Sequence, residues 1–244
     1  MKIPDGLIEK LRRAQSVVVL TGAGVSAESG VPTFRDAQTG LWTNFKPEEL
    51  ATSRAFVRNP RLVWEWYEWR RKLVSNAQPN PAHLALAAWE QRARRFTLIT
   101  QNVDGLHQRA GSRGVIELHG NLARTKCSVE HRLVASWPPT NEVPPRCPHC
   151  GAWLRPDVVW FEESMPEVET ALAFQRSAEC DVFISIGTSA VVHPAAALPR
   201  HAKQHGAMLV EINPQPTPLT PHDDFVLRGP AGEIVPELVA ALAG

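Results

Sequence analysis

The stretch Ser16-Val-Val-Val-Leu-Thr-Gly-Ala-Gly24 decides the fold of this chain. Its apolar, β-branched first half is typical of a strand buried on both faces, and its glycines predict a tight turn at the strand's end. Similar runs recur at residues 95–100, 181–186 and 207–212. Because helical stretches separate these strands, we expect an α/β protein with a Rossmann-like parallel sheet and helices on both faces.

Two stretches depart from this pattern and predict a smaller domain. Residues 47–76 have a helical pattern rich in tryptophan, and residues 121–157 carry three of the four cysteines. We expect a Rossmann-like domain of residues 1–40, 86–120 and 158–244. A helical insertion at 41–85 and a zinc-ribbon-like, metal-binding module at 121–157 would form the small domain. Within the insertion, four residues spaced as one helical stripe are expected to face the core, namely Leu62, Trp66, Trp69 and Leu73.

The composition excludes several classes of protein. The 244 residues are 43% hydrophobic and 21% charged, as in a soluble globular chain. A formal net charge of +1 leaves no excess of cations for a nucleic acid, which is therefore not expected as a partner. No apolar run reaches the roughly 20 residues of a membrane span, and the N-terminus lacks a secretory signal. We expect a cytoplasmic monomer that binds no membrane.

Polar residues follow the predicted strands where a ligand would bind. The glycine-rich turn from Gly22 to Asp36 can hold a pyrophosphate on backbone N–H groups and a helix N-terminus, although a purely structural turn stays open. Asn102 and Asp104 share a face after the second strand, and His119 follows a further short apolar run. A structural role for this histidine is the alternative.

On the helical insertion, Tyr67 and Arg70 lie one turn apart, within reach of one ligand. The spacing alone is equally that of a surface arginine beside a half-buried tyrosine.

Six segments in order resemble the sirtuins, the NAD-dependent protein-lysine deacylases. They are GAGVSAESGVPTFRD from Gly22, TQNVDGLH from Thr100, ELHG from Glu117, the cysteine window, IGTS from Ile186 and EIN from Glu211. Tyr67 and Arg70 match the YxxR signature of class III sirtuins, which remove succinyl, malonyl and glutaryl groups and, more weakly, acetyl. Ala37 matches the small residue that widens the acyl pocket of that class.

The resemblance implies a reaction and a set of roles. NAD would be the co-substrate, acylated protein lysines the substrate, and nicotinamide and 2'-O-acyl-ADP-ribose the products. His119 matches the catalytic base, and Asn102 and Asp104 match residues that hold the nicotinamide ribose. The residues matching NAD contacts are Gly22, Ala23, Gly24, Glu28, Thr33, Phe34, Arg35, Gln101, Asn102, Asp104, Gly187, Thr188, Ser189, Asn213, Pro214 and Ala231. Val159, Trp160 and Phe161 match the strand that pairs with the substrate backbone by β-augmentation.

The chain departs from the family pattern at two places. Family zinc sites use two cysteine pairs, whereas here Cys127, Cys147 and Cys150 are accompanied by Glu130 where a cysteine is expected. Zinc accepts nitrogen and oxygen donors, so Glu130, His131, His149 or water could complete the site; a module without metal is the alternative. Cys180 begins a core strand and is not expected to be a ligand.

The second departure is Glu162, which replaces a glycine of the strand VVWFGE. If that position needs a positive φ, Glu162 carries strain of about 1 kcal/mol, and the affinity for acyl-lysine is the property it affects. Three other functions stay open on sequence: mono-ADP-ribosyl transfer from the same NAD site, a non-catalytic NAD-sensing zinc-ribbon module, and a hydride-transferring dehydrogenase.

Overall fold

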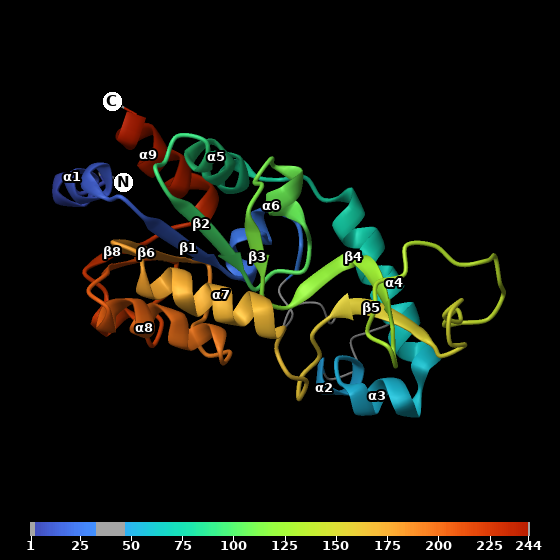
Figure 1. Ribbon diagram of the computed structural model, residues 1–244. Helices are drawn as coiled ribbons and strands as arrows, with labels where there is room; N and C mark the ends of the chain where they lie inside the picture. The colour runs from blue at the N-terminus through green and yellow to red at the C-terminus, as the bar shows by residue number, and fades with distance from the viewer. Residues whose placement is uncertain (1–2, 33–46, 244) are drawn as a thin grey trace.

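A six-stranded parallel sheet forms the centre of the molecule, in the order β3-β2-β1-β6-β7-β8 (Figure 1). The computed structural model describes residues 3–32 and 47–243. The strands are β1 Val17–Thr21, β2 Phe96–Thr100, β3 Val115–Glu117, β6 Val182–Ile186, β7 Met208–Ile212 and β8 Phe225–Leu227. All four apolar runs singled out in the sequence are strands of this sheet, so the predicted Rossmann-like fold is confirmed.

Helices cover both faces of this sheet. One face carries α1 (Asp5–Arg13), α5 (Pro81–Glu90) and α9 (Ala231–Ala243), and the other carries α7 (Glu167–Ala178) and α8 (Leu198–Gln204) (Figure 1). In β1, Val17 and Val19 pack in the core beneath the first group, whereas Val18 and Leu20 pack in the core beneath the second. Burial on both faces explains why β1 is apolar throughout instead of alternating.

A second, antiparallel sheet of two strands supports the smaller part of the molecule. It consists of β4 (Gly120–Cys127) and β5 (Leu154–Val158). Three helices pack beside it: α2 (Pro47–Leu50), α3 (Ser53–Arg58) and α4 (Pro60–Asn76). The short helices are α6 Leu106–Arg109 and the 3-10 turns η1 Ala23–Val25, η2 Ala27–Ser29, η4 Ala195–Ala197 and η5 Thr220–His222. We propose a two-domain division that follows the two sheets.

Local signals set the helix boundaries near the predicted division. Asn59 caps α4 by accepting a hydrogen bond from the Leu62 N–H, and Pro60 occupies the first helical position. Asn80 and His83 form a reciprocal capping box at the start of α5. Helix α5 packs against α9, which covers the large sheet, so α5 belongs with the large domain. We therefore propose that the boundary between the helical insertion and the large domain falls between α4 and α5 instead of at residue 85.

The prediction of the core-facing stripe on α4 is partly wrong. Trp66 is buried and Leu62 and Trp69 are partly buried, but Leu73 is exposed. The neighbouring stripe, with Tyr67 and its companions Val63 and Val74, is the one that is fully buried. The helix packs against β4 and β5 as well as against α3, so its buried arc is wider than one stripe and is turned toward the small sheet.

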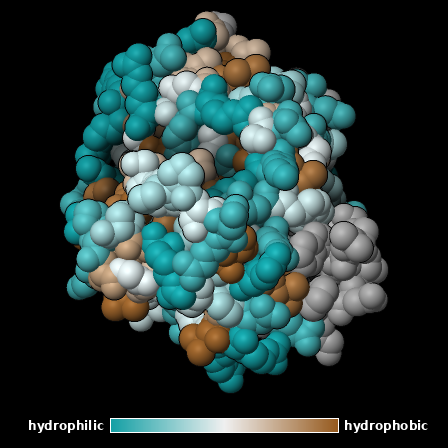
Figure 2. All heavy atoms as spheres, turned by 90° about the vertical axis from the view of Figure 1, so that its right-hand side faces the viewer, coloured by the Kyte–Doolittle hydropathy of each residue, from teal (hydrophilic) through white to brown (hydrophobic). Residues whose placement is uncertain are grey.

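The end of the molecule that carries the small sheet has a largely hydrophilic surface, with hydrophobic residues in small separate groups (Figure 2). Its apolar residues are gathered inside, in one cluster around Trp66 and Trp160 and another around Trp64 and Leu154. Within the described residues, every helix is too short or too polar to span a bilayer.

Candidate active site

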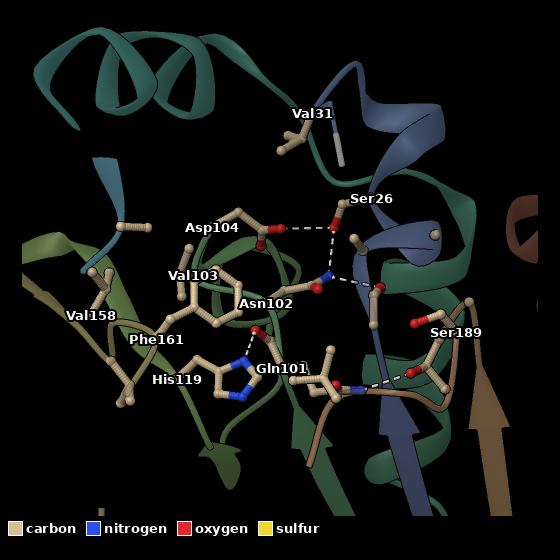
Figure 3. A pocket seen from close by; sticks show the side chains of 18 of the residues that line it. Ser26, Val31, Gln101, Asn102, Val103, Asp104, His119, Val158, Phe161 and Ser189 are labelled. Atoms are coloured by element: carbon tan, nitrogen blue, oxygen red, sulfur yellow. Dashed lines mark hydrogen bonds between the residues drawn. The ribbon is translucent and has the colours of Figure 1, made fainter. Parts of the chain in front are cut away.

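A cavity of about 830 Å³ opens at the carboxyl ends of the central strands (Figure 3). The sheet order runs from β1 to β2 and β3 on one side and from β6 to β7 and β8 on the other. In open α/β sheets, ligands bind at this reversal of strand order. The loops after β1, β2, β6 and β7 all line the cavity, which also reaches the small sheet and α4.

The glycine-rich turn after β1 owes its glycines to close packing against the loop after β6. A Cβ atom on Gly22 would lie 2.8 Å from the Cα of Thr188, and one on Gly24 would lie 2.7 Å from the carbonyl oxygen of Gly187. The N–H groups of Gly22 and Gly24 donate to the carbonyls of Ile186 and Gly187, at 3.0 and 2.8 Å. These two amides therefore already have partners within the protein, and the binding of a pyrophosphate by the turn as a whole stays a prediction.

The conformation after this turn also differs from the prediction. The chain continues into two short 3-10 turns, η1 and η2, instead of an α-helix. Gly30 follows in the left-handed region with φ 75° and open space around it. The late glycine therefore ends the second turn, and a helix N-terminus is absent from the described part of this loop.

Ser26 links the two polar residues that follow β2. Its hydroxyl donates to Oδ2 of Asp104 at 2.8 Å and accepts from Nδ2 of Asn102 at 3.0 Å (Figure 3). The same amide nitrogen donates to the carbonyl of Gly22 at 3.1 Å. Because both N–H bonds of Asn102 are directed at protein atoms, its amide meets a ligand through Oδ1. Ser26 lies within the quoted glycine-rich motif, but the sequence alone did not single it out.

Burial shifts the pKa values of Asp104 and His119 in opposite directions. It raises the pKa of Asp104, against hydrogen bonds from Leu106 and Ser26 that favour the carboxylate. It lowers the pKa of His119, so this imidazole is neutral at pH 7. Nδ1 of His119 lies 2.9 Å from the carbonyl oxygen of Gln101. A carbonyl only accepts, so Nδ1 carries the hydrogen and Nε2 keeps a lone pair with which to take a proton.

Hydrogen bonds join the loops that follow β2, β6 and β7 on the far side of the cavity. Nε2 of Gln101 donates to the hydroxyl of Thr188 at 2.9 Å, and Nδ2 of Asn213 donates to the Thr188 carbonyl at 2.8 Å. Gly187 has a φ of 59°, which favours glycine, and Ser189 also lines the cavity. The loops after β2, β6 and β7 are thus joined through Thr188.

Tyr67 and Arg70 line the same cavity from α4. Burial raises the pKa of Tyr67 to about 12, so the phenol keeps its proton. The Arg70 guanidinium lies 5.0 Å above the Trp66 ring and 5.9 Å above the Tyr67 ring. Burial lowers the pKa of Arg70, and the negative charge of Asp104 opposes that shift. A cation held on aromatic faces in a buried pocket is suited to an anion that enters the cavity.

The segment Val159–Phe161 lines the cavity, but its amides are already occupied. The N–H of Val159 donates to the His119 carbonyl, and that of Phe161 donates to the Ala51 carbonyl, both at 2.9 Å. The N–H of Trp160 donates to a carboxylate oxygen of Glu163. A substrate strand paired with this segment would therefore have to donate its N–H groups to the carbonyl oxygens of Val159–Phe161.

Glu162 has the positive φ that the sequence comparison suggested, at 72°. Its side chain is exposed, forms an ion pair with exposed Arg54 of α3, and lies at the cavity. An exposed pair of this kind stabilises a protein by about 0–1 kcal/mol, which is comparable with the strain at the glycine position.

Several predicted site residues lie elsewhere. Glu28 accepts a hydrogen bond from the Gly232 N–H at the start of α9, and neither it nor Pro214 nor Ala231 lines the cavity. Thr33, Phe34, Arg35 and Ala37 lie outside the described residues. The cavity also includes residues that the sequence did not indicate, among them Ser26, Val31, Pro32, Val103, Val192, His193, Gln215 and Pro216.

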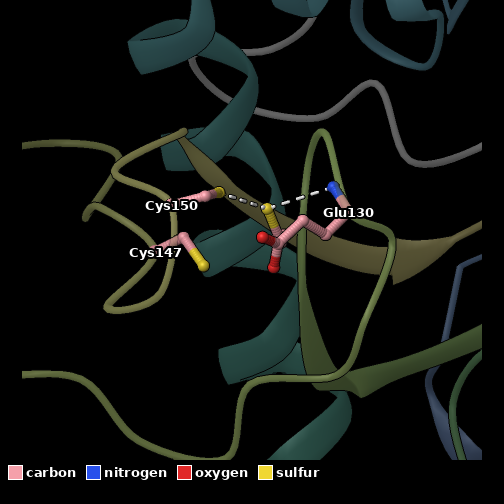
Figure 4. A group of neighbouring side chains, drawn as sticks. Glu130, Cys147 and Cys150 are labelled. Atoms are coloured by element: carbon pink, nitrogen blue, oxygen red, sulfur yellow. Dashed lines mark hydrogen bonds between the residues drawn. The ribbon is translucent and has the colours of Figure 1, made fainter.

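Three cysteines and a glutamate form a candidate metal centre at the end of the small sheet (Figure 4). The Sγ atoms of Cys127, Cys147 and Cys150 and a carboxylate oxygen of Glu130 all lie within 4.8 Å of one another. Tetrahedral zinc with thiolates at about 2.3 Å needs ligand atoms about 3.8 Å apart, so the donor set fits zinc. The Glu130 N–H also donates to Sγ of Cys127 at 3.4 Å.

Of the three side chains that could complete the site, Glu130 is the one that belongs to the cluster. His131 and His149, both described, are not part of the cluster. Cys180 is remote from it and donates to the Ser177 carbonyl in the core, as expected.

Comparison with known proteins assigns the family. A model of the Sir2 family matches residues 22–194. The NAD-dependent protein deacylase of Aquifex aeolicus is 55% identical over 206 residues, 84% of this chain and 86% of the relative. That of Ralstonia nicotianae is 54% identical over 237 residues, 94% of this chain and 93% of the relative. The chain belongs to the Sir2 family, and the predicted enzyme class, NAD-dependent protein deacylase, is confirmed with it.

Solved structures agree with this assignment. The crystal structure of a Sir2 homologue in complex with NAD superposes with a TM-score of 0.93 at 49% identity, covering 99% of this chain and 94% of that one. A Sir2 complex with a p53 peptide and NAD⁺ superposes with a TM-score of 0.85 at 30% identity, covering 98% of each chain. Both neighbours hold NAD, in agreement with the predicted co-substrate.

Proposed function

We propose that this Sir2-family enzyme removes acidic acyl groups, namely succinyl, malonyl and glutaryl, from protein lysines, and acetyl groups more weakly. NAD is consumed, and nicotinamide and 2'-O-acyl-ADP-ribose are released. The observation that carries the acyl preference is that Tyr67 and Arg70 line the same cavity as Asn102, Asp104 and His119.

The preference follows from the chemistry of the acyl terminus. A terminal carboxylate brings a negative charge into the cavity, where it is costly unless it is paired. The Arg70 guanidinium can bind it with two parallel hydrogen bonds, and the protonated phenol of Tyr67 can donate a third. An acetyl group has no carboxylate and offers none of these contacts.

The remaining cavity residues supply orientation and a base. NAD provides the ribose carbon that accepts the acyl oxygen as nicotinamide leaves. Asn102 and Asp104, held by Ser26, orient that ribose, and Nε2 of His119 takes the proton from a ribose hydroxyl. Since burial lowers the pKa of His119, the base is available without prior deprotonation at pH 7.

We also propose that zinc in the small domain is structural. Cys127, Glu130, Cys147 and Cys150 would hold it, because they join the end of β4 to the loop before β5. The metal would close this loop by cross-linking its two ends.

A panel of acetyl-, malonyl-, succinyl- and glutaryl-lysine peptides, assayed with and without NAD, tests the acyl preference. Arg70→Met should lower kcat/KM for succinyl-lysine by about 10-fold or more relative to acetyl-lysine, as expected for losing a hydrogen-bonded charge. Arg61→Met, on the exposed side of the same helix, is the matched control. Equal loss on both substrates would disprove the preference.

The same assay tests the base and the reaction type. His119→Tyr should abolish turnover while NAD binding, measured by calorimetry, persists. A near-normal rate would remove His119 from the mechanism. Transfer of ADP-ribose to the peptide, seen as a mass increase, would identify ADP-ribosyl transfer instead.

A further inference from the structure

The indole of Trp160 makes a buried hydrogen bond to the only tyrosine of the chain. Nε1 of Trp160 lies 3.0 Å from the hydroxyl oxygen of Tyr67. An indole N–H can only donate, so the phenol oxygen is the acceptor. Both residues are buried, at 2% and 3% exposure, and their rings lie 6.3 Å apart. The contact joins α4 to the segment that follows β5.

Trp160 is held on its ring and on its backbone. The guanidinium of Arg155 stacks 3.3 Å from the ring centroid. Glu163 binds Arg155 through two hydrogen bonds, of 2.6 and 2.9 Å, and accepts the Trp160 N–H at 2.9 Å. The hydroxyl of Ser53 donates to the same carboxylate at 2.6 Å. The ion pair with Glu163 thus holds the Arg155 guanidinium against the face of the Trp160 indole.

This contact decides where the Tyr67 hydroxyl hydrogen points. A phenol O–H prefers the plane of its ring, so the hydrogen has two favoured positions, one on each side of the C–O bond. The Trp160 N–H occupies the lone pair on one side and leaves the other side for the hydrogen. The phenol stays protonated because burial raises its pKa to about 12.

We infer that Trp160 is a positioning residue for acyl selection: its indole N–H orients the Tyr67 hydroxyl so that its hydrogen is presented to the terminal carboxylate of the acyl group. This inference rests on the proposed preference for acidic acyl groups. Trp160 therefore acts through Tyr67 and adds a specificity role to the backbone pairing expected of its segment. An acetyl group has no carboxylate to receive the hydrogen and does not depend on the contact.

A double-mutant cycle tests the inference. Trp160→Phe keeps an aromatic ring and removes the N–H, and should lower the succinyl-to-acetyl ratio of kcat/KM by about fivefold, the size of one neutral hydrogen bond. The change should lie in the KM for the succinyl peptide. In a Tyr67→Phe background, Trp160→Phe should leave the ratio unchanged, because the hydroxyl that it orients is gone.

The outcomes separate this inference from the proposed function. A wild-type enzyme that does not favour succinyl-lysine overturns both. A wild-type enzyme that favours it, combined with an unchanged ratio in Trp160→Phe or with equal losses on both substrates, overturns the role of Trp160 alone. Independent effects of the two substitutions in the double variant also overturn it.

A spectroscopic readout isolates the contact itself. Because Tyr67 is the only tyrosine in the sequence, protein labelled with [13Cζ]tyrosine gives one signal. Trp160→Phe should move that signal in the free enzyme, and the succinyl peptide should move it in the wild type. If Trp160→Phe does not fold, Tyr67→Phe should shift one indole N–H resonance among the eight tryptophans. Unmoved signals would refute the hydrogen bond.

Discussion

Acid should destabilise this protein through two buried imidazoles beneath the active site. His83 and His107 are 0% and 1% exposed, and their ring centroids lie 4.7 Å apart. Burial lowers the pKa of His83 to about 4. Burial and the neighbouring His83 together lower the pKa of His107 to about 3. Nε2 of His107 contacts the Thr21 hydroxyl at 2.9 Å, whereas its Nδ1 has no hydrogen-bond partner among the described residues.

The sign and size of the effect follow from these values. Both pKa values are below the unfolded value of about 6.5, so below that pH the unfolded chain takes up protons that the folded chain refuses. Stability is therefore fully present above pH 6.5 and is lost as the pH falls toward 4 and 3. Between pH 7 and pH 5, each imidazole lowers the free energy of unfolding by about 2 kcal/mol.

Urea unfolding at pH 7 and pH 5 measures this loss. His107→Gln removes one titrating group, so its loss of stability between the two pH values should be smaller than that of the wild type by about 2 kcal/mol. The exposed His205, replaced by glutamine, is the matched control and should leave the loss unchanged. An identical pH dependence in His107→Gln and wild type would refute the reasoning.

Substitutions at Gly120 and Glu130, each with a control, test the small sheet and its candidate metal centre. Gly120→Ala should lower the free energy of unfolding by more than about 2 kcal/mol, because its Cβ would lie 2.2 Å from a carbonyl oxygen of β5. Gly206→Ala, also at positive φ but in open space, should lose only about 1 kcal/mol, and equal losses would contradict the steric argument. Glu130→Ala should weaken zinc binding about tenfold or more in competition with a chelator, whereas Glu130→Cys should retain it. Unchanged affinity in Glu130→Ala would exclude the carboxylate as a ligand.

The central strands could be predicted from the sequence because each is buried on both faces. All five residues of β1 are buried, and a run of that kind has few alternatives. The edge strands β3 and β8 have three residues each, which is too short for a periodic signal. The prediction of the core-facing stripe on α4 was partly wrong for a different reason. The face of α4 that is buried depends on its packing against the small sheet, whose strands are distant in the sequence.

The candidate site was predictable where residues follow strands and unpredictable where side chains meet across the fold. Gln101, Asn102 and Asp104 come directly after β2, so the topology brings them to the cavity. The contact between Tyr67 and Trp160 spans 93 residues, and no spacing in the sequence indicates it. The glycines of the first turn were recognised, but their contacts with Gly187 depend on two loops that only the folded sheet brings together.

The short stretch from Val159 to Glu163 links the proposed acyl selection to the proposed base, His119. Val159 binds the carbonyl of His119, while the next residue, Trp160, binds Tyr67. The Leu118 N–H, next to His119 on the other side, donates to the Thr100 carbonyl at the end of β2. His119, the proposed base, is therefore held between the large sheet and the stretch proposed to select the acyl group. A displacement of that stretch should change acyl preference and turnover together, whereas loss of the indole N–H should act mainly on the preference.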